Sequence, residues 1–493
     1  MEVGGRKMNN TKNIVIIGGG PAGMAATIEA VRAGAHCTLI DEAPLVGGQV
    51  YRQVSGHFQA IEKPLNAEQL RGKRLLAEFK EIAEHIEVLN STSVLGIWKN
   101  HEVLWGSEGA SGVINADQLI IASGAYERPV PFPGWTLPGV MTAGGVKSFI
   151  KTMHVKPGLR AVVSGAGPLI ISTANRLHEI GVEVIAVLES GNPPWSSPSF
   201  LNEWTDVEYA KDIADDLAEL KRNDIPLLFN HSVFEAHGMD EVSSVTYGPV
   251  DFQQWKPLKD QEITIDADLV VLGFGFIPNT ELSQLAGCQH EFYNGIGWFV
   301  SKDELMQTSV PWILSAGDSS KIGGAVLAED EGRIAGIRAT ENLGLISAYD
   351  AKNRYEKPLR RIRAFETFRN TINEASAFRK GLLALITPDT LVCRCEEVAL
   401  SQVKEAIDHG IGDLQSLKLF TRLGMGSCQG RNCAPSMGEY LCHALNRIPE
   451  EVGRINPRPP VKPVTLGALA QMAMAEKAIE SDSFDAINRG GIQ

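Results

Sequence analysis

Residues 13–23 read Asn-Ile-Val-Ile-Ile-Gly-Gly-Gly-Pro-Ala-Gly, and this stretch decides the fold. Its first five residues, Asn13–Ile17, form a β-branched apolar run that predicts a short buried strand. The next six satisfy the spacing G-x-G-x-x-G with Gly18, Gly20 and Gly23. In this spacing the first glycine permits a tight turn, and the second lets the backbone approach a pyrophosphate. The third lets the following helix pack closely on the strand.

The residues that follow complete a strand–helix–strand unit. An alanine-rich helical stretch ends at Gly34, and His36–Ile40 predicts a second strand, which is followed by Asp41. A carboxylate about twenty residues beyond the glycines can accept hydrogen bonds from an adenosine ribose. The pyrophosphate of the same ligand would meet the free amides at the start of the helix. The order of these elements predicts a nucleotide site. FAD, NAD and ATP share the ADP half, so the residues leave the choice among them open.

Length and composition set outer limits. The 493 residues correspond to about three domains, and 44% hydrophobic residues are enough for a full core. A net charge of −13 argues against a nucleic-acid partner, which would need a basic surface. We find neither an apolar run of membrane-spanning length nor a signal peptide in the sequence. With only seven cysteines we expect a cytoplasmic protein, which reaches the inner face of the membrane only through a partner or electron acceptor.

Two later segments favour a flavoprotein with two dinucleotide-binding domains. Leu119–Gly124 is an apolar strand that runs into Ser123-Gly124, and Trp312–Asp318 is another that ends in Gly317-Asp318. They resemble the two internal motifs of the FAD/NAD-linked reductases. There the first turn packs on the nucleotide, and the aspartate of the second faces the ribityl chain and pyrophosphate of the flavin. Taken singly, each segment also fits an ordinary strand that ends in a turn.

The opening unit is repeated at Ala161–Ser190, where a glycine-rich turn again lies between a strand and a helix. The third glycine is replaced by Ile170, and a branched side chain there should separate helix from strand. The repeat predicts an inserted NAD-like domain whose nicotinamide site is weak or unused. Cys37 and Cys288 stand singly in apolar surroundings, which indicates core residues rather than a redox disulfide.

Four cysteines, Cys393, Cys395, Cys428 and Cys433, follow the pattern C-x-C and C-x₄-C near the C-terminus. Four thiolates suit zinc or a [2Fe–2S] cluster, whereas a reducing compartment disfavours disulfides. Zinc modules typically use C-x₂-C pairs, and a one-electron carrier fits a module attached to a flavin domain. We therefore favour [2Fe–2S], with zinc or an empty site as alternatives. Cys442 lies on the apolar side of a predicted helix and is interpreted as a core residue.

The chain as a whole resembles the A (alpha) subunits of heteromeric flavin-dependent opine and amino-acid dehydrogenases. That family includes octopine and nopaline oxidases, the B subunit of hydrogen cyanide synthase, D-hydroxyproline dehydrogenase and dye-linked L-proline dehydrogenase. The C-terminal module is similar to the bacterioferritin-associated-ferredoxin type but has C-x₄-C in place of C-x₂-C. The resemblance is carried by GGGPAGMAA (18–26), LIDEAPLVGGQVYRQ (39–53), IASGAYERPVPFPGW (121–135), SAGDSSKIGGA (315–325), CRCEEV (393–398) and GMGSCQGRNCAP (424–435).

The resemblance implies that an opine or amino acid is oxidised at the C–N bond in a separate, glycine-oxidase-like B (beta) subunit. This chain would relay the electrons, with FAD in its first site (NAD or ATP as alternatives) and a [2Fe–2S] cluster. FMN at an interface with a partner and a small ferredoxin-like subunit complete the implied complex. No catalytic acid or base is assigned. The residues expected to line the nucleotide are Gly18, Gly19, Gly20, Pro21, Ala22, Gly23, Asp41, Glu42, Gly48, Gln49, Ser123, Gly124, Gly317 and Asp318.

Two other functions stay open at this point: an autonomous NAD(P)H-dependent flavin reductase, and a scaffold whose nucleotide and cluster are structural. The expected fold is α/β, of the FAD/NAD-linked reductase type with two dinucleotide-binding domains and a small helical [2Fe–2S] domain. The predicted divisions are the FAD-type domain at 1–155 and 291–345, the inserted NAD-like domain at 156–290, a helical connector at 346–389, the four-cysteine domain at 390–450 and a C-terminal arm at 451–493.

Overall fold

The computed structural model describes residues 12–53, 67–204 and 207–471. The opening stretch forms the central strand of a parallel sheet, and every residue of Ile14–Ile17 is buried. The predicted strand, glycine turn, helix and second strand are all present. The strand order is β20 (Ile313–Ser315), β7 (Gln118–Ile121), β1 (Asn13–Ile17), β2 (His36–Ile40) and β3 (Ile86–Leu89).

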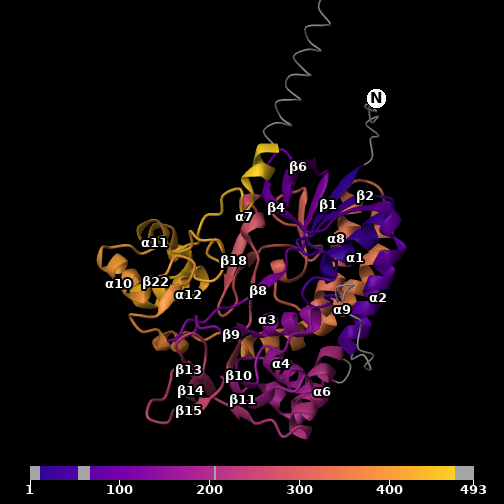
Figure 1. The fold of residues 1–493 in the computed structure, drawn as a ribbon. Helices are drawn as coiled ribbons and strands as arrows, with labels where there is room; N and C mark the ends of the chain where they lie inside the picture. Colours follow the sequence, from indigo (N-terminus) through magenta and orange to yellow (C-terminus); the bar gives the residue numbers. More distant parts are fainter. Residues whose placement is uncertain (1–11, 54–66, 205–206, 472–493) are drawn as a thin grey trace, which may run out of the picture.

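Helices α1 (Pro21–Arg32) and α8 (Ala325–Asn342) pack on this sheet, and their backbones come unusually close to each other. Helix α2 (Ala67–Glu81) lies beside α1 (Figure 1). A Cβ added at Gly332 or Gly336 would lie 2.1 Å from the carbonyl oxygen of Ala22 or 2.3 Å from that of Ala26. Only glycine therefore lets the two helix backbones approach this far.

The inserted domain contains a second parallel sheet, built around the repeat of the opening unit. Its strand order is β12 (Leu227–Phe229), β11 (Glu183–Glu189), β10 (Arg160–Gly165), β16 (Leu269–Gly273) and β9 (Val140–Thr142). Its helices are α3 (Ala143–Ser148), which continues into a π-helical turn at Phe149–Met153, then α4 (Pro168–Glu179), α5 (Pro198–Asn202) and α6 (Glu208–Arg222). The two parallel sheets are the α/β arrangement that the sequence predicts.

Smaller antiparallel sheets extend and connect the two domains. Strands β8 (Ala125–Glu127) and β17 (Phe276–Pro278) pair where the chain passes between the domains. The remaining ones are β4 (Thr92–Ile97), β5 (Glu102–Ser107) and β6 (Ala110–Asn115); β13 (His231–His237), β14 (Ser244–Pro249) and β15 (Ile263–Asp266); and β18 (His290–Tyr293) with β19 (Gly297–Val300). Helix α7 (Glu281–Leu285) and short 3₁₀ turns complete this part of the chain.

A long helix, α9 (Ala348–Ala375), leads to the C-terminal module through a 3₁₀ segment at Lys380–Leu385. The module consists of β21 (Leu391–Cys393), β22 (Val398–Ala399), α10 (Leu400–Asp408), α11 (Leu414–Thr421), α12 (Ala434–Leu445) and α13 (Pro449–Val452). Asp413 caps α11 by accepting a hydrogen bond from the Ser416 amide, 2.8 Å away.

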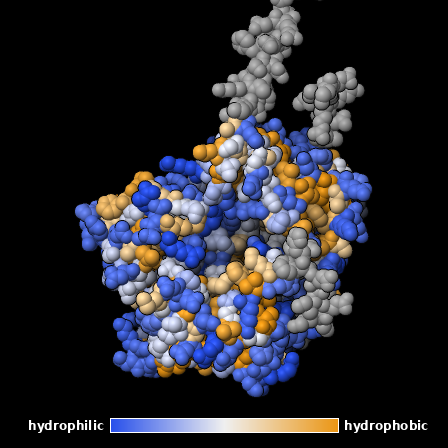
Figure 2. Space-filling view, viewed as in Figure 1, coloured by the Kyte–Doolittle hydropathy of each residue, from blue (hydrophilic) through white to orange (hydrophobic). Residues whose placement is uncertain are grey.

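The module packs on one side of the molecule, and the surface is hollowed where it meets the other domains (Figures 1 and 2). Within the described ranges, no helix combines the length and apolar character that a membrane span requires.

Candidate functional site

The glycine turn after β1 is closed by backbone contacts that leave no room for side chains. A Cβ at Gly23 would lie 1.7 Å from the carbonyl oxygen of Gly18, so the start of α1 rests directly on the turn. Gly18 has φ +101°, and a Cβ there would lie 2.3 Å from the carbonyl oxygen of Ala122. Pro21 and Ala22 form the first turn of α1. The turn therefore presents bare backbone amides at a helix N-terminus, as pyrophosphate binding requires.

Asp41 lies at the end of β2 and is held against this turn. Its carboxylate accepts hydrogen bonds from the amide of Gly19 and, at 2.6 Å, from that of Ala43. Burial raises its pKa above the usual value, although the two amide hydrogen bonds oppose that shift. A second turn closes from the other side, because a Cβ at Gly48 would lie 2.7 Å from the Cα of Gly20.

The two later turns meet the same edge of the sheet. Gly317 packs against the start of α1, where its Cβ position lies 3.0 Å from the Ala22 Cβ. Asp318 accepts hydrogen bonds from the amides of Gly323 and Gly324 at 2.8 and 3.0 Å. Ser123 donates to the Asn279 carbonyl at 3.0 Å, and the Cβ position of Gly124 faces open space.

Two of the predicted nucleotide residues lie at the edge of the site formed by these glycine turns rather than inside it. Glu42 is exposed and forms a 3.0 Å ion pair with Lys462 of the C-terminal arm. Gln49 is also exposed and accepts a hydrogen bond from Arg52. The remaining predicted residues come together at the carboxyl edge of the sheet, where ligands bind in open parallel sheets. Whether they line a nucleotide stays a prediction.

The equivalent turn in the inserted domain has a different construction. Ile170 is fully buried and packs toward glycines at the ends of two adjacent strands. Its Cγ2 lies 2.9 Å from the Cβ position of Gly165 and 2.7 Å from that of Gly273. The two missing side chains make room for the isoleucine, so α4 still begins at this turn.

The chain itself fills the nucleotide cleft above this second turn. The residues after α9 lie against it, with Ser376 Oγ 2.9 Å from the Cβ position of Gly167. The fully buried Trp255 ring lies 3.7 Å from the Cβ position of Gly191 and contacts Phe378. A cavity of about 70 Å³ is left there. A dinucleotide would have to displace these residues to reach the cleft.

Glu189 occupies the position in this domain that Asp41 occupies in the first. It accepts hydrogen bonds from the amides of Gly167 and Gly191 at 2.8 and 3.0 Å. Its carboxyl is completely buried, and burial raises its pKa to about 7. The group is therefore sealed from a ribose, whereas Asp41 is only partly buried.

The four cysteines of the C-terminal module come together as two pairs. Cys393 lies beside Cys433, and Cys395 lies beside Cys428. Across the described part of the chain, no three or more His, Cys, Asp or Glu side chains are arranged to hold one metal ion. The four thiols thus gather in one region of the module, since Cys433 also interacts electrostatically with Cys395 and Cys428. Cys442 is buried on α12, and Cys37 and Cys288 are buried elsewhere, which confirms their interpretation as core residues.

Charge is distributed unequally within the buried pair. The thiol hydrogen bond from Cys433 lowers the pKa of Cys393 to about 5, assisted by the amides of Gly424, Glu396 and Cys395. The same hydrogen bond, together with burial, raises the pKa of Cys433. The pair therefore holds one thiolate near neutral pH, with backbone amides directed at its sulfur.

The residues that fasten the module to the flavin-type domain were not assigned to any site by the sequence. Arg128 forms a 3.1 Å ion pair with Glu439 of α12, and their side chains are only 2% and 9% exposed. Ser436 donates to the Pro129 carbonyl at 2.7 Å, and Trp135 donates to the Leu391 carbonyl at 2.6 Å. All three contacts use segment 128–135, which belongs to a stretch that carries the family resemblance but was given no contact role.

Comparison with known proteins identifies both parts of the chain. Residues 12–332 match the pyridine nucleotide-disulphide oxidoreductase family, and residues 387–472 match the sarcosine oxidase A3 domain. Hydrogen cyanide synthase subunit HcnB of Pseudomonas aeruginosa is 37% identical over 93% of this chain and 98% of its own length. The A subunit of opine oxidase from Agrobacterium tumefaciens is 31% identical over 95% of this chain and 93% of its own length.

The fold is also found in solved structures. L-proline dehydrogenase from P. horikoshii aligns with a TM-score of 0.65 at 20% identity, over 94% of this chain and 80% of that one. Thioredoxin reductase from T. acidophilum aligns with a TM-score of 0.50 at 19% identity, over 67% of this chain and 99% of that one. The C-terminal module thus belongs with the sarcosine oxidase A3 domain, and a [2Fe–2S] cluster within it stays a prediction.

Proposed function

The chain belongs to the pyridine nucleotide-disulphide oxidoreductase family, with close relatives among the A subunits of heteromeric flavin enzymes, and from that premise we propose that it is an electron-transfer subunit. In this proposal a partner subunit oxidises an opine or amino acid at its C–N bond. This chain accepts the electrons and passes them onward. The partner is a glycine-oxidase-like B (beta) subunit, and a small ferredoxin-like subunit can complete the complex.

The observation that carries the proposal is the contrast between the two dinucleotide clefts. The first cleft has backbone amides without covering side chains, close contacts between glycines, and the Asp41 carboxylate beside them. The second cleft is covered by Ser376 and Trp255. A reductase that works alone needs a nicotinamide beside its flavin, and this cleft has no space for one. Electrons should therefore arrive from another polypeptide, which disfavours an autonomous NAD(P)H-dependent reductase.

We assign FAD to the first cleft, with Gly18–Gly23, Asp41, Gly48, Ser123-Gly124 and Gly317-Asp318 around it. A flavin accepts two electrons and releases them singly. The amides of the glycine turn and of α1 would hold its pyrophosphate, and Asp41 would hold the ribose hydroxyls. Glu42 and Gln49 would contribute from the edge of the site. FMN at the interface with the partner belongs to the same proposal.

The four cysteines would hold a [2Fe–2S] cluster through their two pairs. A [2Fe–2S] cluster has four thiolate ligands spread over two iron atoms, whereas zinc draws four ligands to a single point. The pairs Cys393–Cys433 and Cys395–Cys428 correspond to the first pattern. The amides directed at Cys393 are the type of hydrogen bond that adjusts the potential of such a cluster.

The test is to purify the full chain with its co-expressed partner subunits and to determine flavin, iron and the visible spectrum. Anaerobic addition of opines, proline, hydroxyproline and glycine should then reduce the flavin and afterwards the iron–sulfur absorption. A matched variant with Cys395→Ser and Cys428→Ser should lose iron but keep its flavin. Cys442→Ser, outside both pairs, should keep both.

Three results would decide against the proposal. A colourless, iron-free complex would remove the electron carriers. Rapid bleaching of the isolated chain by NADH would favour the reductase. Partner turnover without any reduction of this chain would favour a scaffold role.

A further inference from the structure

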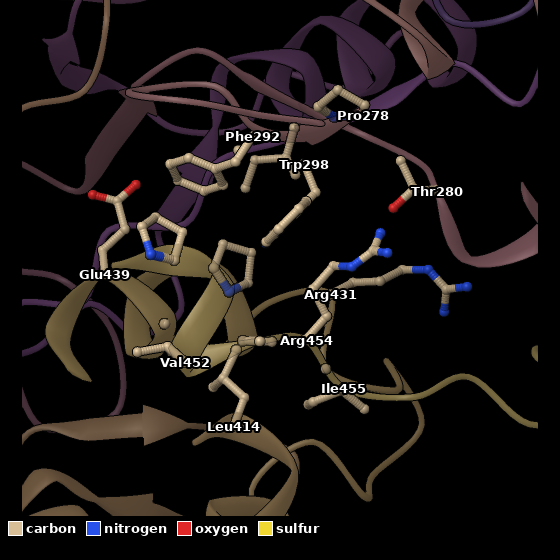
Figure 3. A pocket seen from close by; sticks show the side chains of 18 of the residues that line it. Pro278, Thr280, Phe292, Trp298, Leu414, Arg431, Glu439, Val452, Arg454 and Ile455 are labelled. Carbon is tan, nitrogen blue, oxygen red and sulfur yellow. The ribbon is translucent and has the colours of Figure 1, made fainter. Parts of the chain in front are cut away.

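A separate cavity lies between the C-terminal module and the other two domains, where the surface is hollowed (Figures 2 and 3). Its volume is about 130 Å³, which is room for on the order of ten water molecules. Strands β8, β17, β18 and β19 form one wall, and α12 with the residues after α13 forms the other. None of the residues assigned to the nucleotide lines it.

The charges around this cavity do not balance. Its lining includes four cationic side chains and two carboxylates: Arg128, Lys380, Arg431, Arg454, Glu281 and Glu439. Both carboxylates are already engaged, Glu439 by Arg128 at 3.1 Å and Glu281 by Arg431 at 3.0 Å. Two positive charges, on Lys380 and Arg454, therefore face the cavity without an acidic partner in its described wall.

Arg454 is the more confined of these two cations. Its guanidinium lies 4.8 Å from the centre of the Trp298 ring, and its Nη1 is buried without a hydrogen bond in the described structure. Burial lowers its pKa to about 10, and no carboxylate of the described residues opposes that shift. A half-buried cation without an ionic partner is costly, so an anion bound beside it would be favoured.

The remaining wall defines the kind of anion that fits. Apolar side chains line other parts of the cavity, among them Pro278, Phe292, Leu414, Val452 and Ile455. Figure 3 shows Arg431 and Arg454 extending along the cavity toward the side where Thr280 lies. An inorganic ion would leave the aromatic wall without a contact, whereas a planar apolar body would cover it.

We propose that this cavity binds an organic oxyanion: a small molecule with a planar apolar body and a carboxylate or phosphate group that pairs with Arg454. The planar body lies against Phe292 and Trp298. Arg431, which lines the same cavity, donates to the Cys428 carbonyl at 3.2 Å, so the bound molecule would lie next to the cysteine pairs. Binding in this cavity does not depend on which cofactors the chain carries.

The test uses the purified full chain and the fluorescence of Trp298. Benzoate and phenyl phosphate are titrated as probes, with inorganic phosphate and neutral benzyl alcohol as comparisons. We expect saturable quenching by one or both aromatic anions, and the stronger of the two identifies the preferred anionic group. Trp298→Phe should remove the quenching signal. Arg454→Met should weaken binding by about tenfold or more, because it deletes charge-assisted hydrogen bonds to the ligand.

A matched control is Arg458→Met, which removes an exposed arginine four residues further along the same arm and should leave binding unchanged. Without ligand, the Tm of the Arg454→Met protein should equal or exceed that of the wild type, because an unpaired half-buried charge is removed. Quenching by none of the probes, equal binding of benzyl alcohol, or unchanged binding in Arg454→Met would overturn the proposal. So would a lower Tm of unliganded Arg454→Met.

Discussion

Arg128→Met should loosen the C-terminal module from the rest of the molecule. Besides its ion pair with Glu439, Arg128 donates to the carbonyls of Gly295 and Ile296 at 3.0 and 2.9 Å. Its guanidinium also lies 5.2 Å from the centre of the Phe378 ring. Methionine fills much of the same volume but offers no donor, so a buried carboxylate and two carbonyls lose their partner.

The magnitude follows from how deeply the pair is buried. Removing one partner of a buried ion pair costs about 3–5 kcal/mol, and solvent screening is weak because the side chains are 2% and 9% exposed. Glu439→Gln keeps an acceptor for Arg128 but removes its counter-charge, and it should cost about 2–3 kcal/mol, less than Arg128→Met. In Arg128→Met/Glu439→Leu both charges are gone, so the double variant should be less destabilised than the sum of its single changes. We expect a coupling energy of about 2 kcal/mol.

Urea denaturation of the full chain, followed by tryptophan fluorescence, measures these differences. Hydrogen exchange of the α12 amides shows where they act, and protection should fall there before it falls in β1. Arg360→Met on α9 removes an exposed arginine and should change stability by less than about 0.5 kcal/mol. A loss in Arg128→Met no larger than in this control, or additive single changes, would refute the reasoning.

Three shorter predictions concern the two clefts. Gly23→Ala should abolish flavin retention, measured as flavin per chain after gel filtration, because its Cβ would lie 1.7 Å from the Gly18 carbonyl oxygen. Equilibrium dialysis of the flavin-loaded chain should detect no NADH binding, since Ser376 covers Gly167, and saturable binding would show that the second cleft opens. The raised pKa of Glu189, from 4.5 to about 7, stabilises the folded chain below about pH 4.5, and this contribution is lost as the pH rises through 7. Glu189→Gln should therefore flatten the pH dependence of unfolding between about pH 5 and 7, by an amount on the order of 3 kcal/mol, and an unchanged slope would contradict the assignment.

In the C-terminal module, the local sequence pattern predicts only features that depend on neighbouring residues. Cys442 is buried on α12 as its position on the apolar side of a predicted helix indicates, because that pattern depends only on residues within a turn or two. The glycines Gly332 and Gly336 passed unnoticed in the sequence. These glycines are needed because the backbone of α1, some three hundred residues earlier, packs against them, and not because of their own helix.

The candidate sites divide in the same way. The sequence alone determined the first glycine turn, its repeat and the place of Asp41 after the second strand, because glycine spacing and β-branched runs restrict the backbone locally. It also located the four thiols, although not their pairing. Only the tertiary structure decided that Ser376 covers Gly167, that the four thiols gather in one region of the module, and that Arg454 is left unpaired. Each of these depends on which side chains from distant segments share a small buried volume, and that is fixed by packing rather than by neighbours along the chain.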